Sequence, residues 1–216
     1  MDVMIYGGGF LGCQMFRLIK DYFADNYNVL GFIDDYKSKG TPVVNDLLVL
    51  GSLENVRRIR EYSPIKAKLL FAIGYSNMKG REDAFLRAKQ ANYSFEKLIH
   101  PQALVALSAN LGEGVIVTCG AIIDQSVSIG NVNYLDIGVR IGENCVIGSN
   151  NYFSNSATIA GYVRIGDGNF FGLNCTVVNN IIIGNNNFIN AASLVYKNVE
   201  DNKKLVEVRQ QRSIGN

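Results

Sequence analysis

An aliphatic or phenylalanine residue returns at every sixth position of this sequence for fifteen consecutive repeats, from Val105 to Ile189. Within this run, a finer pattern of glycine and asparagine recurs every 18 residues. Its members are Gly112, Gly130, Gly148, Gly166 and Gly184, and Asn133, Asn151, Asn169 and Asn187. A six-residue unit whose detail repeats every third unit describes a three-sided coil with one short strand per side. The repeat therefore predicts a parallel β-solenoid, in which each strand pairs with the one in the next coil.

The asparagine column is expected to be structural. The four residues occupy the same inward place in successive coils. Parallel, in-register stacking lets side-chain amides bond up and down a ladder. Because amides are not bases, we do not expect the column to carry chemistry.

The first 98 residues have a different pattern, in which strand-like and helix-like segments alternate. Strands are expected at 3–6, 28–33, 48–50 and 69–73, and helices at 11–23, 53–62 and 82–90. Alternating strands and helices favour a mostly parallel sheet. The predicted fold is therefore a Rossmann-like α/β domain followed by a β-solenoid, with a junction around His100.

Three segments of the α/β domain follow predicted strands, at the edge where ligands of such sheets bind. The first contains G-x-G-x-x-G, and a glycine-rich turn at the start of a helix suits an anion. The candidate ligand-binding residues are Gly7, Gly8, Gly9, Asp34, Asp35, Gly74, Ser76 and Asn77.

The same glycines also fit a dinucleotide site. Asp34 lies 22 residues after Gly12, close to where a dinucleotide fold places its ribose-binding acid. However, only about 100 residues precede the repeats, which leaves little room for that fold together with a redox substrate domain. A nicotinamide cofactor therefore stays an alternative.

Composition excludes several classes of protein. The formal charge of +2 gives no reason to expect a nucleic-acid partner. No apolar run approaches the ~20 residues of a membrane span, and residues 1–12 lack the basic start and the cleavage site expected of a signal peptide. The four cysteines show no metal spacing, and Cys145 and Cys175 fall on small inward positions. We expect a reduced, cytoplasmic protein without a metal.

The two halves together resemble the hexapeptide-repeat nucleotide-sugar N-acyltransferases of the sialic-acid-O-acetyltransferase-like group. The matching stretches are 5–9, 31–35, 71–74, 98–101 and the repeats through 160–166, and the resemblance covers about residues 1–198. It implies a left-handed β-helix and a homotrimer. The expected organisation is a nucleotide-sugar-binding domain at 1–98, an acyltransferase β-helix at 99–198 and a C-terminal tail at 199–216.

The resemblance also implies an activity. These enzymes transfer an acyl group from acyl-CoA, a co-substrate rather than a resident cofactor, to the amine of a nucleotide-linked amino sugar, here expected to carry UDP or dTDP. It places the nucleotide on the glycine turn and on Asp34 and Asp35. It places the thioester oxygen against the backbone N–H of Gly161, an oxyanion-type contact. Tyr152 matches a family histidine near the donor thiol.

One departure from the family pattern concerns the residue that removes the proton from the sugar amine. The position of the usual histidine base aligns with Glu143, and the only histidine of this chain is His100 at the junction. The 18-residue period independently makes Glu143 and Gly161 neighbours at one corner, ~4.8 Å apart. Asp136 aligns near a sugar-contacting position and could orient the amine.

Two routes for the proton therefore stay open. Glu143 is an adequate base only if burial or a neighbour raises its pKa. Alternatively, the amine attacks without a protein base, the departing thiolate takes the proton, and the site supplies positioning.

Two other functions remain as alternatives. One is a sugar O-acetyltransferase, although an alcohol needs a base more than an amine does. The other is a non-catalytic nucleotide-sugar-binding solenoid. The tail contains Arg209 and Arg212 but lacks the Gly-x-Pro-Ala usual in the family, so neither arginine is assigned to the site.

Overall fold

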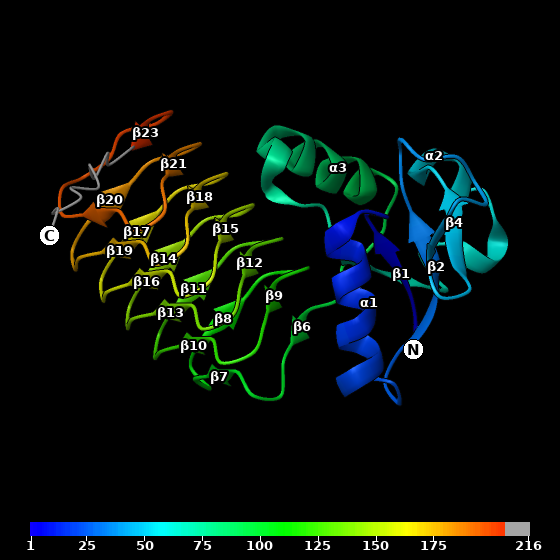
Figure 1. Cartoon of the computed structure of the whole chain (residues 1–216), viewed down its shortest axis with the longest axis horizontal. Coiled ribbons are helices and arrows are strands. Elements are labelled where there is room, and N and C mark those ends of the chain that lie inside the picture. The colour runs from blue at the N-terminus through cyan, green and yellow to red at the C-terminus, as the bar shows by residue number, and fades with distance from the viewer. Residues whose placement is uncertain (206–216) are drawn as a thin grey trace, which may run out of the picture.

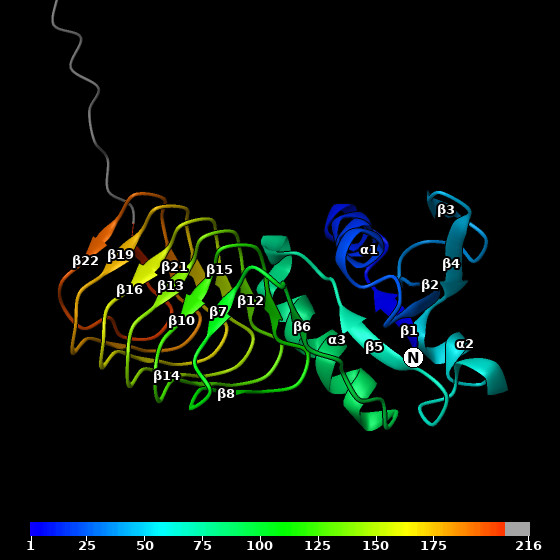
Figure 2. The same ribbon diagram turned by 90° about the horizontal axis from the view of Figure 1, so that it is seen from below.

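The computed structural model describes residues 1–205 as an α/β domain followed by a solenoid (Figures 1 and 2). The elements of the first domain are β1 (Asp2–Tyr6), α1 (Phe10–Tyr22), β2 (Asn28–Ile33), β3 (Pro42–Val44), β4 (Leu47–Gly51), α2 (Leu53–Val56), a 3₁₀ turn η1 (Arg60–Tyr62), β5 (Lys68–Phe71), a second 3₁₀ turn η2 (Tyr75–Asn77) and α3 (Met78–Gln90). The predicted α/β domain is confirmed.

The five strands of this domain lie in the order β3-β4-β2-β1-β5, and all pairs are parallel except β3 with β4. Alternate residues of β1 point to opposite faces, as in any strand. Val3 and Ile5 pack with α1 on one face, whereas Met4 and Tyr6 pack with α2 and α3 on the other. This two-sided covering is that of an open α/β sheet.

Three local predictions differ from the structure. The helix expected at 82–90 begins earlier, at Met78. The helix expected at 53–62 ends at Val56, and Ile59 is extended before the short turn η1. Ser63 is extended as well, because it precedes Pro64 and a residue before proline is pushed away from helical geometry. The hairpin β3–β4 was not predicted, although Asn45 turns it with a positive φ of 50° that asparagine tolerates.

The solenoid consists of two-residue strands. They are β6 (Leu98–Ile99), β7 (Leu104–Val105), β8 (Asn110–Leu111), β9 (Ile116–Val117), β10 (Ile122–Ile123), β11 (Ser128–Ile129), β12 (Tyr134–Leu135), β13 (Arg140–Ile141), β14 (Val146–Ile147), β15 (Tyr152–Phe153), β16 (Thr158–Ile159), β17 (Arg164–Ile165), β18 (Phe170–Phe171), β19 (Thr176–Val177), β20 (Ile182–Ile183), β21 (Phe188–Ile189), β22 (Leu194–Val195) and β23 (Lys204–Leu205).

These strands form three parallel sheets, as in a left-handed β-helix. The first sheet contains β6, β9, β12, β15, β18, β21 and β23; the second runs from β7 to β22, and the third from β8 to β20. Up to β22, paired residues are 18 apart, for example Leu135 with Phe153. The predicted three-sided coil is therefore confirmed.

The coils meet at three corners, which we number by the sheets they join. The first corner, from the first to the second sheet, holds Asp136. The second corner, from the second to the third sheet, holds Glu143 and Gly161. The third corner, from the third sheet back to the first, holds Val132 and Asn150.

The interior follows the sequence pattern. The every-sixth residues from Leu111 onward are buried, and Cys145 and Cys175 are completely inaccessible. The asparagine ladder is also present: Asn151 Oδ1 accepts from the backbone N–H of Asn169 at 2.8 Å, and Asn133 and Asn169 repeat the contact one coil below and above. The column is therefore structural, as predicted.

The outer surface of the first sheet packs against the α/β domain. Tyr134, Tyr152 and Phe170 stack on this surface and join the same hydrophobic cluster as α1. The solenoid continues past residue 198, since β23 pairs with β21. Arg209 and Arg212 lie outside the described residues. Within residues 1–205, no helix is long and apolar enough to cross a membrane.

Candidate functional site

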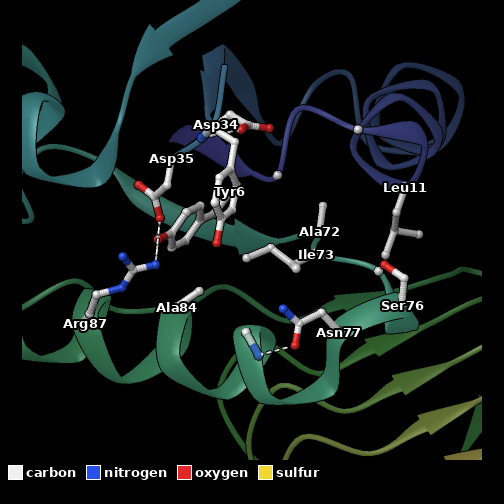
Figure 3. A pocket seen from close by; sticks show the side chains of 15 residues that line it. Tyr6, Leu11, Asp34, Asp35, Ala72, Ile73, Ser76, Asn77, Ala84 and Arg87 are labelled. Atoms are coloured by element: carbon white, nitrogen blue, oxygen red, sulfur yellow. Dashed lines mark hydrogen bonds and ion pairs between the residues drawn. The ribbon is translucent and has the colours of Figure 1, made fainter. Parts of the chain in front are cut away.

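A cavity of about 280 Å³ lies between the carboxyl ends of β1, β2 and β5 on one side and α3 on the other (Figure 3). All three predicted ligand-binding segments contribute to its wall. Its lining residues are Tyr6, Gly7, Gly9, Leu11, Asp34, Asp35, Tyr36, Ala72, Ile73, Gly74, Ser76, Asn77, Gly80, Ala84 and Arg87. Of the predicted ligand-binding residues, only Gly8 does not line it.

The glycine turn at one side of the cavity is required by packing. Gly7 has a φ of 121°, and a Cβ on it would lie 2.3 Å from the Ala72 carbonyl oxygen. A Cβ on Gly12 would lie 1.9 Å from the Gly7 carbonyl oxygen. Gly9 faces open space and caps α1 without any side-chain hydrogen bond. The N-terminus of α1 is therefore open to an anion at the cavity.

Asp34 organises this turn. Its Oδ2 accepts from the Gly8 N–H at 3.0 Å, and its Oδ1 accepts from the N–H groups of Tyr36 and Lys37. The Lys37 ammonium donates to the Gly8 carbonyl oxygen at 2.6 Å, which places a cation at the glycine turn. Much of the Asp34 carboxylate is thus engaged by backbone, and part of its role is to shape the turn.

Asp35 belongs to a second network at the far end of the cavity. Its Oδ2 accepts from the Tyr6 hydroxyl at 2.6 Å and from the Arg87 guanidinium at 2.8 Å, and its Oδ1 accepts from the Leu53 N–H. Burial, and then the bond to Asp35, raise the pKa of Tyr6, so its hydroxyl stays protonated. This end therefore presents hydrogen-bond donors and acceptors between the apolar walls formed by Ile73 and Ala84.

The opposite end of the cavity, at Leu11 and Ser76, lies toward the solenoid (Figure 3). The neighbouring Tyr75 packs on the first sheet, with ring centroids 4.9 Å from Tyr152 and 4.6 Å from Phe170. A ligand longer than the cavity can therefore extend from this end toward the solenoid.

Asp136 lies at the first corner, directly after the strand that carries Tyr134. It is half-buried, and burial raises the pKa of its carboxyl group, while a hydrogen bond from the Ile137 N–H opposes the shift. Its charge also contributes to raising the pKa of Tyr134 and of Tyr152, after burial. The three side chains thus share one electrostatic environment.

Glu143 and Gly161 are neighbours at the second corner, as the 18-residue period predicted. A Cβ on Gly161 would lie 3.2 Å from Glu143 Cγ. The Tyr162 N–H donates to the Glu143 carbonyl oxygen, whereas the Gly161 N–H donates to no acceptor among the described residues. The Glu143 side chain is exposed. An unused N–H therefore lies beside a carboxylate, although a free N–H also occurs at Glu143 itself.

The structure does not bring all the predicted residues together within one chain. Tyr152 is buried beneath the α/β domain on the first sheet, away from the corner that holds Gly161. Asp136 and Glu143 lie at different corners, with β13 between them. One chain therefore has a cavity in the α/β domain, Asp136 at the first corner of the solenoid and Glu143 at the second corner.

Several residues around the cavity were not predicted from the sequence. Tyr6 was predicted only as part of a strand, and Arg87 only as part of a helix. Lys37 was not considered. No local pattern marks these residues, because their contacts join segments that are distant in the sequence.

His100 lies at the junction, as predicted, and does not face the cavity. Its ring is 2% exposed and packs against Tyr22 of α1, with centroids 4.2 Å apart. Burial lowers its pKa, and Nδ1 accepts from the Gln102 N–H. It therefore acts as a neutral packing residue in this chain.

Comparison with known proteins gives matches among solved structures alone. No family model matches this chain, and no curated protein matches it. A perosamine N-acetyltransferase from Caulobacter crescentus, solved as a histidine-to-asparagine variant with CoA and GDP-perosamine, superposes with a TM-score of 0.84 and 25% identity over 94% of this chain and 92% of that one.

Two further structures share the fold at lower identity. The acetyltransferase domain of PglB from Neisseria gonorrhoeae has a TM-score of 0.83 and 20% identity, over 94% of this chain and 95% of that one. WeeI from Acinetobacter baumannii has a TM-score of 0.81 and 19% identity, over 96% and 97%. These two show the fold alone. The predicted resemblance to nucleotide-sugar N-acyltransferases, and with it the enzyme class, is confirmed by the match to the Caulobacter crescentus N-acetyltransferase.

Proposed function

We propose that this protein transfers an acyl group from acyl-CoA to the amine of a nucleotide-linked amino sugar. The observation that carries the proposal is the match, over nearly the whole of both chains, to an N-acetyltransferase solved with CoA and a nucleotide-linked amino sugar. The cavity in the α/β domain adds support, because its wall comes from the three segments that the sequence predicts for a nucleotide.

In this proposal the nucleotide occupies the cavity. The diphosphate lies against the glycine turn, where the open N-terminus of α1 and the Lys37 ammonium both favour negative charge. The base and ribose lie toward Asp35 and Arg87, where donors and acceptors are available. The sugar leaves the cavity past Ser76, toward the first sheet and Asp136. A UDP or dTDP carrier remains our prediction.

The transfer requires the sugar amine, the thioester and the Gly161 N–H to lie close together. The amine nitrogen forms a bond to the thioester carbonyl carbon, and the carbon–sulfur bond breaks. The Gly161 N–H stabilises the oxyanion that forms between these events. The amine proton passes finally to the CoA thiolate, giving an amide and free CoA. Asp136 orients the amine, and Glu143 lies beside the thioester.

The acyl-transfer site is proposed to form between copies of the chain. Asp136 and Glu143 lie at different corners of one solenoid, so both can face one sugar only if they come from neighbouring subunits. A homotrimer would place the second corner of one solenoid in a groove beside the first corner of the next. In that arrangement Tyr152 would lie on the side of the site that holds the sugar, not on the side that holds the thioester.

The test is release of free thiol. Purified protein is incubated with acetyl-CoA and with UDP-, dTDP- or GDP-linked amino sugars, and thiol is measured with a chromogenic reagent. Thiol release that requires both the sugar amine and its nucleotide is expected. Release with the hydroxyl analogue of the sugar, but not with the amine, would indicate O-acylation instead. Tight nucleotide binding without thiol release from any acyl donor would indicate a binding protein.

A further inference from the structure

A buried arginine joins the α/β domain to the solenoid. Arg81 of α3 is 1% exposed. Its Nε donates to Asn150 Oδ1 at 3.0 Å, its Nη2 to the Val132 carbonyl oxygen at 2.7 Å, and its Nη1 to the Ile73 carbonyl oxygen. The guanidinium thus contacts two successive coils at the third corner and one strand end of the α/β domain.

Among residues 1–205, the charge of Arg81 has no acidic partner. None of the ion pairs within residues 1–205 includes it. Burial lowers its pKa to about 10, so it remains a cation at neutral pH. It lies over the rings of Phe71 and Tyr152, at 5.0 and 5.9 Å from their centroids. Because a buried charge is costly and an apolar side chain there is often neutral or stabilising, stability alone does not explain the arginine.

The backbone that receives Arg81 is strained. Val132 has a φ of 48°, at a corner position where the neighbouring coils have glycine or asparagine. A β-branched residue at positive φ is a true outlier, and such strain persists only where surrounding contacts fix it. Here the Val132 side chain is buried against the α/β domain, in the cluster that contains Tyr93 and Phe95. The corner is therefore shaped to hold the α/β domain.

The third acceptor of Arg81 belongs to the nucleotide cavity. Ile73 lines the cavity and directly precedes Gly74, which lines it too. One planar group consequently fixes both the cavity wall and the coils of the solenoid. Its three bonds use the fork of the guanidinium, which a lysine ammonium does not reproduce.

We propose that Arg81 is a positioning residue that sets the register between the nucleotide cavity and the solenoid, and so aligns the sugar amine with the thioester. This inference rests on the proposed function. Nucleotide binding needs the cavity alone, whereas transfer needs the cavity at the correct distance from the corners. Loss of Arg81 therefore lowers kcat more than it weakens nucleotide binding.

The test uses Arg81→Met, Arg81→Lys and Asn150→Gly in the full chain. Asn186→Gly is the matched control, because Asn186 occupies the equivalent corner position at a φ of 56° and has no contact with Arg81. Calorimetric titration with UDP, dTDP or GDP gives Kd and the number of sites per chain. For the three test variants we expect one site per chain, Kd within threefold of the wild type, and kcat at least tenfold lower. The control should match the wild type in all three.

One site per chain excludes loss of folded protein as the cause of a lower kcat. Amide hydrogen exchange supplies a readout that needs no reaction: the hydrogen-bonded amides of α3, which carries Arg81, should exchange at least tenfold faster in Arg81→Met and Asn150→Gly, but not in the control. Unchanged exchange there, or a kcat within threefold of wild type, would overturn the inference. A wild-type chain that releases no thiol refutes the proposed function only, because the exchange rates still decide the role of Arg81.

Discussion

The asparagine ladder predicts that the same substitution, asparagine to alanine, lowers the free energy of unfolding by different amounts at Asn151 and at Asn187. The Asn151 side chain makes three hydrogen bonds: its Oδ1 accepts from the N–H and from Nδ2 of Asn169, and its Nδ2 donates to the Gly166 carbonyl oxygen. Asn187 makes one side-chain bond, in which Oδ1 accepts from the Lys203 N–H, and its buried Nδ2 has no partner among the described residues.

Each hydrogen bond of this kind contributes about 1 kcal/mol, and a buried group left without a partner costs about 1–3 kcal/mol. Asn151→Ala should therefore lower the free energy of unfolding by about 3–5 kcal/mol, and Asn187→Ala by about 1 kcal/mol. The two substitutions remove the same atoms from the same column, so their packing losses nearly cancel in the comparison. The difference of about 2–4 kcal/mol reports the hydrogen bonds.

The assay is urea unfolding followed by circular dichroism, with both variants at one protein concentration so that any contribution of assembly to stability is the same for both. The midpoint should fall much further for Asn151→Ala than for Asn187→Ala, with unchanged slopes. Equal losses would refute the reasoning, since they would mean that the amides contribute only by filling space.

Two further predictions concern the proposed chemistry. Burial raises the folded-state pKa of Asp136, so the protonated carboxyl group contributes to the stability of the fold. This contribution is complete below the ordinary pKa of ~3.9 and is lost as the pH rises through the folded-state pKa. Asp136→Asn should consequently melt at a higher temperature than the wild type at pH 7 but not near pH 4, while acyl transfer falls; a lower melting temperature at pH 7 would contradict this. In the proposed transfer the amine proton passes to the CoA thiolate, and the Glu143 side chain is exposed. Glu143→Gln should therefore reduce kcat by less than threefold in the thiol-release assay, and a loss of two orders of magnitude would instead identify Glu143 as the base.

The solenoid could be predicted in detail because its structure is periodic. A slip of one residue would turn the inward side chains outward, so the unbroken run from Val105 to Ile189 fixes the register of the coils that it spans. The α/β strands were also predictable, since each is a short apolar run bounded by turn residues. The hairpin at Asn45 was missed because its first strand is only three residues long and begins with a proline, which argues against a strand.

The cavity was predictable only in part. Glycine turns and acidic residues after strands mark the sheet edge where ligands bind, and they are visible in sequence. Arg87 and Arg81 lie on one helix and differ only in which face they occupy. Arg87 reaches Asp35, and Arg81 reaches the solenoid at Val132. Such contacts depend on how two domains pack, and no pattern within α3 records that.

The placement of Asp136 and Glu143 shows why sequence distance misleads in a solenoid. They lie within seven positions of each other in the chain, which suggests one site. However, Asp136 follows a strand of the first sheet and Glu143 follows a strand of the second, so the coil carries them to different corners. The Arg81 contacts hold the cavity against the face that leads to Asp136, whereas the unused Gly161 N–H lies at the corner of Glu143. If both act on one sugar, the cavity of one subunit must serve the second corner of another, and a single chain should bind the nucleotide but transfer nothing.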